Sequence, residues 1–140
     1  SVDDTKQIIS ILQSRFPEIK SPNSDDICYA TQNRQDAVKQ LALETEFIIV
    51  VGSENSSNSN RLKELAELMG TKSCLVDHVS QLSEIELQDI RRLGITSGAS
   101  APEELVKEII SYCEGFGFSI VEEIQGLTEN ISFKLPKELR

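Results

Sequence analysis

A loop of small polar side chains carries the clearest chemistry in this sequence. It spans Gly52–Asn60, reads Gly-Ser-Glu-Asn-Ser-Ser-Asn-Ser-Asn, and has serine or asparagine at seven of nine positions. Helical periodicity follows it, and the first N–H groups and the dipole of a helix attract anions. Small side chains let a phosphate approach the backbone. A helix cap needs only one such residue, so we favour an anion or polar-ligand site over an ordinary capped turn.

Two further segments have related chemistry and a related position. The loop Ser97–Ala101 reads Ser-Gly-Ala-Ser-Ala and precedes Pro102, a residue suited to the first position of a helix. The segment Cys28–Asn33 follows a short apolar run. Parallel sheets place all their strand-to-helix loops at the carboxyl edge, where ligands bind. We therefore expect the three segments to converge.

The cysteines and the single histidine leave several interpretations open. Cys28 has Thr31 and Arg34 close by, so it is either a metal or cluster ligand, a nucleophile, or a buried apolar cysteine. Cys74 and Cys113 lie in apolar patterns and are expected in the core. His78 is expected to be structural or solvated rather than a general base. The sequence contains no catalytic triad, metal-spaced cluster, GxGxxG motif or P-loop.

The elements that must position these residues alternate along the chain. Helical patterns are predicted at about 3–16, 33–44, 59–69, 83–90 and 102–115, and strands at 27–31, 47–51, 73–76, 93–96, 118–121 and 131–135. Strands that alternate with helices predict an α/β fold with a small parallel sheet and helices on both faces. The polar stretch 21–26, with Pro22, is the only plausible domain boundary.

Composition excludes several classes of protein. A net charge of −9 argues against nucleic-acid binding and against an anionic membrane surface. No apolar run approaches the roughly 20 residues of a membrane span. Three widely spaced cysteines form no disulfide framework and suit a reducing, cytoplasmic setting.

Four long stretches together resemble one known family. They are Asp25–Gln35 (Asp-Asp-Ile-Cys-Tyr-Ala-Thr-Gln-Asn-Arg-Gln), Val50–Ser53 continuing through Asn55–Leu62, Gly98–Pro102, and the tail Lys134–Arg140. In this order they are similar to the LytB/IspH family of 4-hydroxy-3-methylbut-2-enyl diphosphate reductases. The resemblance extends over essentially all 140 residues.

The resemblance implies a reaction, a cofactor and a partner. The family converts 4-hydroxy-3-methylbut-2-enyl diphosphate to isopentenyl and dimethylallyl diphosphates, the last step of the methylerythritol phosphate route to isoprenoids. Its [4Fe-4S] cluster is held by three cysteines among three small α/β domains, and an electron donor such as ferredoxin or flavodoxin supplies the electrons. By resemblance Cys28 is one cluster ligand, and Thr31 lies near the substrate. The diphosphate-binding residues would be Ser56, Ser57, Asn58 and Ser100.

The departures from the family limit what this chain does alone. The resemblance covers only the C-terminal portion of the family. The other two cysteines, the diphosphate-binding histidines and a proton-relaying glutamate belong to the missing portion. We therefore expect residues 1–24 to end the middle domain, residues 25–140 to form the third domain, and the chain alone to be inactive, with no catalytic residue of its own. Ser97 stands where the family usually has alanine. The expected location is the cytoplasm, or a plastid in a plant or alga.

Two alternatives remain on the residues themselves. The same loops are compatible with a non-catalytic phosphate-binding module in which Cys28 is structural. They are also compatible with an α/β structural or interaction domain whose loops are only capped turns. Diphosphate binding separates this last alternative from the other two.

Overall fold

The computed structural model describes residues 2–20, 29–85 and 87–119. Its elements, in chain order, are α1 (Val2–Arg15), α2 (Tyr29–Glu44), β1 (Phe47–Val51), α3 (Ser57–Leu68), β2 (Lys72–Val76), the 3₁₀ helix η1 (Val79–Glu84), β3 (Leu93–Ser97) and α4 (Glu103–Gly115). Within these residues, no helix is long and apolar enough to cross a bilayer.

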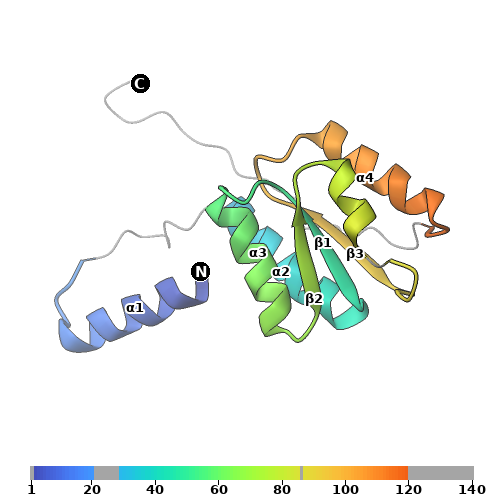
Figure 1. Cartoon of the computed structure of the whole chain (residues 1–140). Helices are drawn as coiled ribbons and strands as arrows, with labels where there is room; N and C mark the ends of the chain where they lie inside the picture. Colours follow the sequence, from blue (N-terminus) through green and yellow to red (C-terminus); the bar gives the residue numbers. More distant parts are fainter. Residues whose placement is uncertain (1, 21–28, 86, 120–140) are drawn as a thin grey trace, which may run out of the picture.

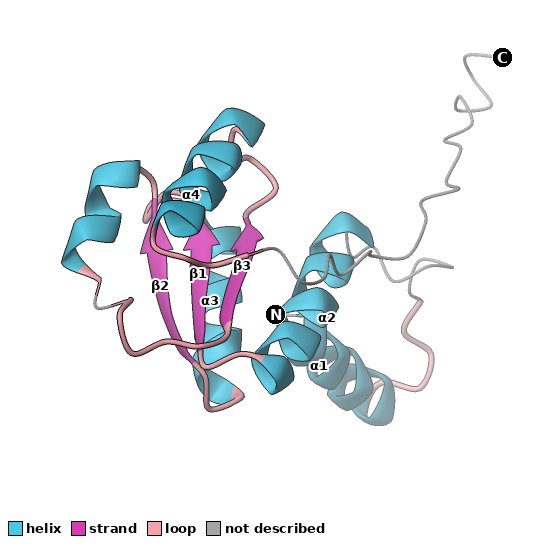
Figure 2. Ribbon diagram, turned by 90° about the vertical axis from the view of Figure 1, so that its right-hand side faces the viewer, coloured by secondary structure: helices cyan, strands magenta, loops and turns pink. Residues whose placement is uncertain are grey.

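The three strands form one parallel sheet in the order β2-β1-β3. Val51, the last residue of β1, pairs with Val76 on one side and Ser97 on the other. The strands therefore end level with one another, and in Figure 2 all three arrowheads point the same way. The loops that leave these strands start from the same edge, as the sequence predicts.

The central strand β1 explains why helices cover both faces of the sheet. Its side chains alternate between the faces, and those of residues 48–51 are fully buried. Ile48 and Val50 pack with α2 and α3, whereas Ile49 and Val51 pack with η1 and α4. Figure 1 shows α4 on the opposite side of the sheet from α2 and α3. The predicted α/β class is confirmed.

The helix α1 lies outside these layers (Figure 1). Ile8 and Ile11 of this helix, and Phe16 directly after its end, are all more than half exposed. One ion pair links it to α3, with 3.6 Å between Asp4 Oδ2 and Arg61 Nη2.

Three predicted elements differ from the structure. Residues 29–31 are the first turn of α2 rather than a strand end, because a short apolar run does not distinguish the two by periodicity. The helix predicted at 83–90 is replaced by η1, which begins earlier at a capping box between His78 and Gln81. Leu87 is nevertheless buried, so irregular chain satisfies the apolar pattern. Residues 118 and 119 are not in a strand, and residues 120–121 and 131–135 lie outside the described residues.

Candidate anion-binding site

The loop after β1 uses part of its polar side chains to build the start of α3. Ser56 is the N-cap, with extended backbone angles (φ −88°, ψ 109°), and its Oγ accepts a hydrogen bond from the Ser59 N–H at 3.3 Å. Asn60 Nδ2 donates to the carbonyl oxygens of Glu54 at 2.6 Å and Ser56 at 3.0 Å. These bonds fix the turn, and they leave the backbone N–H groups of Ser57 and Asn58 without intrahelical partners.

Asn58 is the most unusual residue of this turn. Its side-chain Oδ1 and Nδ2 are both buried, and neither has a hydrogen-bond partner among the described residues. A buried polar group without a partner costs roughly 1–3 kcal/mol, so natural proteins rarely leave one unmatched. The neighbouring Ser57 is exposed and also has no partner within the described part of the chain. The oxygens of an anionic ligand would accept from Asn58 Nδ2 and from the Ser57 hydroxyl, whereas Asn58 Oδ1 requires a donor.

The two small-residue loops meet at the buried side chain of Ser59. Gly52 N donates to Val76 O, and Gly98 N donates to Val51 O, each at 2.9 Å, so both loops continue the strand ladder before they diverge. A Cβ placed on either glycine would lie 2.2 Å from Ser59 Oγ. Ser59 is completely buried. The two glycines thus form a notch that admits the Ser59 hydroxyl and nothing larger.

The start of α2 lies at the same edge. Arg34 Nε donates to Ser97 O at 3.2 Å, which fixes this part of α2 to the carboxyl end of β3. Thr31 lies three residues before Arg34 and so on the same face of the helix. The expected convergence is therefore confirmed for the two small-residue loops, and Arg34, the residue after the segment Cys28–Asn33, joins α2 to the same edge.

Comparison with known proteins decides the family. The family model described as LytB protein matches residues 1–114. This chain belongs to the LytB protein family. The 4-hydroxy-3-methylbut-2-enyl diphosphate reductase of Saccharophagus degradans is 56% identical to this LytB chain over 140 residues, which are 100% of the chain and 45% of that protein. The reductase of Acinetobacter baumannii is 53% identical, over 100% of the chain and 44% of that protein.

A solved structure supports the same relationship. The E-1-hydroxy-2-methyl-but-2-enyl-4-diphosphate reductase of Plasmodium falciparum matches with a TM-score of 0.83 and 31% identity, over 98% of this LytB chain and 44% of that chain. A second solved reductase matches with a TM-score of 0.59 and 30% identity, over 64% of this chain and 32% of that one. The LytB chain thus spans about 45% of the length of the curated relatives it matches.

The structure places the predicted ligand residues of the LytB chain as follows. Ser56, Ser57 and Asn58 are consecutive at the N-terminus of α3. Ser100 is exposed in the loop that begins at Gly98, and Thr31 lies in the first turn of α2. Cys28 lies outside the described residues, and so does the tail 134–140.

Sequence reasoning missed the part played by Ser59 and its two glycines. The signal was present, since a glycine directly follows both β1 and β3. It could not be interpreted, because the notch forms only when the two loops lie side by side. The sequence also contains no sign that Arg34 joins α2 to β3, because the two segments are far apart in the chain.

The other candidate groups are structural. Cys113 is buried in the core between the sheet and α4, and Cys74 packs against the same core. Burial raises the pKa of Cys74 to about 11 and also raises the pKa of Cys113. Both thiols pack among apolar side chains of this core, which is the place that the sequence predicts for them. His78 caps η1 through Nδ1, which accepts from Ser80 N at 3.2 Å. No group of three or more metal-binding side chains occurs within the described residues.

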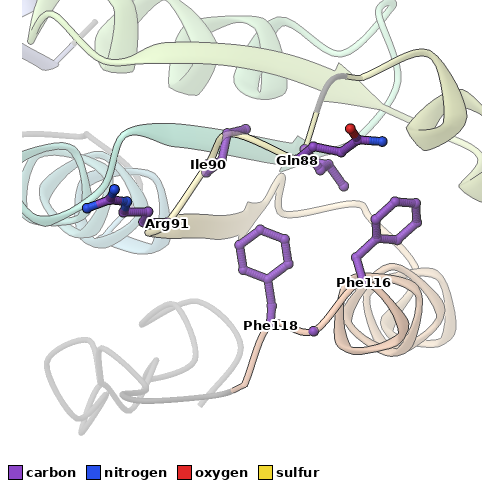
Figure 3. A pocket seen from close by; sticks show the side chains of 7 residues that line it. Gln88, Ile90, Arg91, Phe116 and Phe118 are labelled. Atoms are coloured by element: carbon purple, nitrogen blue, oxygen red, sulfur yellow. The ribbon is translucent and has the colours of Figure 1, made fainter.

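An open hollow of about 350 Å³ lies elsewhere, beside the segment before β3 and the end of α4. Figure 3 shows the rings of Phe116 and Phe118 rising from the end of α4 toward the segment with Gln88, Ile90 and Arg91. This position is near the amino end of β3, away from the edge where Ser56–Asn58 lie.

Proposed function

We propose that this chain is the C-terminal, diphosphate-binding portion of a 4-hydroxy-3-methylbut-2-enyl diphosphate reductase. This oxidoreductase of isoprenoid biosynthesis converts its substrate to isopentenyl and dimethylallyl diphosphates. The observation that carries the proposal is the buried, unpartnered amide of Asn58 beside Ser56 and Ser57. It occurs in a chain that is 56% identical to a protein of that name. The same identity argues against a non-catalytic phosphate-binding module.

The diphosphate would be held by neutral donors rather than by a basic cluster. The donors are the hydroxyls of Ser56 and Ser57, the amide of Asn58 and the two free backbone N–H groups at the start of α3. Arg61 follows in the same helix. Its Nη1 pairs with Glu64 at 3.0 Å and its Nη2 with Asp4 at 3.6 Å, while its buried Nε has no hydrogen-bond partner among the described residues. Ser100 would bind from the loop after β3, and Thr31 would contact the substrate from α2.

The remaining parts of the proposal concern the cluster and the rest of the enzyme. Cys28 would be one cysteine ligand of the cluster; it lies outside the described residues. When bound, the [4Fe-4S] cluster supplies electrons and a Lewis-acidic iron. Residues 1–24 would end the middle domain, and residues 25–140 would form the third. The electron donor would be a ferredoxin or flavodoxin, and the location the cytoplasm or a plastid.

The exposed apolar face of α1 fits this division of the enzyme. Ile8, Ile11, Leu12 and Phe16 are 38–64% exposed, so α1 presents an apolar stripe. The preceding portion of the reductase would cover it. The chain alone, without that portion, is expected to lack reductase activity.

The anion site can be tested by calorimetric titration of the chain with inorganic pyrophosphate. Ser57→Ala should weaken binding by about tenfold or more, because a hydrogen bond to a charged group contributes about 1.5–3 kcal/mol. Ser56→Asp offers a sharper test, since aspartate is also a good N-cap but repels an anion. It should keep the thermal stability and lose binding. Ser111→Ala, an exposed serine of α4, is the matched control. Equal affinity in all four chains would contradict the proposal.

The reductase activity needs a second experiment. Joining this chain to the preceding portion of the Saccharophagus degradans reductase should give an enzyme that reduces the allylic diphosphate, whereas the chain alone should not. Pyrophosphate binding without any recovered activity in a folded chimera would favour a non-catalytic phosphate-binding module. Activity of the chain alone would contradict the proposed division of the enzyme.

A further inference from the structure

The hydrogen bonds of Ser56 and Ser59 determine where the proton of Ser56 points. Ser59 is completely buried, and its Oγ lies 3.1 Å from Ser56 Oγ. Gly52 and Gly98 enclose this hydroxyl, and Ser56 Oγ is its only hydrogen-bond partner among the described residues. A buried hydroxyl without an acceptor is costly, so the Ser59 O–H donates to Ser56.

Ser56 Oγ therefore accepts two hydrogen bonds. One comes from the Ser59 hydroxyl at 3.1 Å and the other from the Ser59 backbone N–H at 3.3 Å. A serine hydroxyl has two acceptor lone pairs and a single hydrogen. With both lone pairs occupied, Ser56 keeps only its donor function. Its hydrogen has no acceptor among the described residues, and a ligand oxygen would supply one.

We propose that Ser59 is a positioning residue that makes Ser56 an obligate hydrogen-bond donor to the diphosphate. This inference rests on the proposed function of the loop. Ser59 itself is buried and does not touch the ligand; it acts through Ser56. The arrangement also explains why the notch is lined by two glycines, because any Cβ at either position would displace the Ser59 hydroxyl. At the position that Ser56 faces, a donor with no free acceptor favours an ionised phosphate oxygen over a protonated one.

The test is a pair of double-mutant cycles, read as the dissociation constant for inorganic pyrophosphate. Ser59→Ala alone should weaken binding by about fivefold, since Ser56 regains a free lone pair and loses its fixed orientation. In the Ser56→Ala background, Ser59→Ala should cause no further loss. In the Ser57→Ala background it should keep its full effect, because no hydrogen bond links Ser57 to Ser59 in the described structure. Thermal unfolding of each variant confirms that the folded chain is being titrated.

The outcomes separate this inference from the proposed function. If Ser59→Ala weakens pyrophosphate binding by the same factor in the Ser56→Ala and the Ser57→Ala backgrounds, then Ser59 has a merely structural role and the inference is overturned. Unchanged binding in Ser59→Ala would overturn it as well, while the anion site itself would stand. Failure of the unaltered chain to bind pyrophosphate would refute the proposed anion site, and the inference with it.

Discussion

Replacing Gly98 by alanine tests the notch around Ser59 most directly. The new Cβ would lie 2.2 Å from Ser59 Oγ, whereas the next nearest atoms, Ser59 Cβ and Cα, are 3.4 and 3.8 Å away. The clash therefore involves one oxygen atom. Gly98 does not have a positive φ, so alanine adopts its backbone conformation without strain.

Two opposing contributions determine how much Gly98→Ala changes the free energy of unfolding. Overpacking a tight site costs about 1–3 kcal/mol. Restricting the unfolded chain by a glycine-to-alanine change returns about 0.4–1 kcal/mol. We expect Gly98→Ala to lower the free energy of unfolding by about 1–2 kcal/mol. In a Ser59→Ala background the clashing oxygen is absent, so the same change should be neutral or slightly stabilising.

The assay is urea unfolding followed by circular dichroism. The four chains are the unaltered protein, Gly98→Ala, Ser59→Ala and the double variant. Gly52→Ala is the matched control, because its Cβ would also lie 2.8 Å from Ser59 Cβ, a contact that Ser59→Ala retains. Ser59→Ala should therefore rescue Gly98→Ala and fail to rescue Gly52→Ala. If Gly98→Ala lowers the free energy of unfolding equally in the unaltered chain and in the Ser59→Ala background, then the clash with Ser59 Oγ is not its cause and the reasoning is refuted.

Two further predictions concern titratable groups. The Glu46 carboxylate accepts the Arg91 N–H at 2.9 Å, and this bond is the main cause that lowers its pKa below the usual 4.5. The resulting stability is present above pH 4.5 and is lost as the pH falls through the lower folded pKa, so Glu46→Gln should flatten the acid side of the stability profile. The measurement is the urea midpoint of both chains from pH 3 to 7, and the same pH dependence of the midpoint in Glu46→Gln as in the unaltered chain would contradict the prediction. The second group is Cys74, whose pKa of about 11 leaves about one thiol in a thousand ionised at pH 8. Its alkylation, followed by mass spectrometry, should be about a hundredfold slower in the folded chain than in urea, and similar rates would contradict the burial of this thiol.

Much of the fold follows from local sequence patterns. The apolar run of β1 predicts a strand buried on both faces, and the alternation of strands with helices predicts a parallel sheet. Parallel pairing in turn puts the loops after β1 and β3 at one edge. Patterns of this kind involve neighbouring residues, so they can be interpreted without knowing the fold. The predicted strand end at 29–31 and the predicted helix at 83–90 are wrong, because short apolar runs have no distinctive period and the capping of η1 places its start earlier, at Val79.

The sequence by itself determined the α/β class, the position of the polar loop and the candidate ligand residues Ser56, Ser57, Asn58 and Ser100. The tertiary structure alone decided which of the polar side chains are available. It buries Ser59 in a notch made by glycines from two loops, and it leaves the Asn58 amide buried without a partner among the described residues. It also joins α2 to β3 through Arg34. The physical reason is that burial and hydrogen-bond satisfaction depend on contacts between segments distant in the chain, which periodicity and composition do not encode.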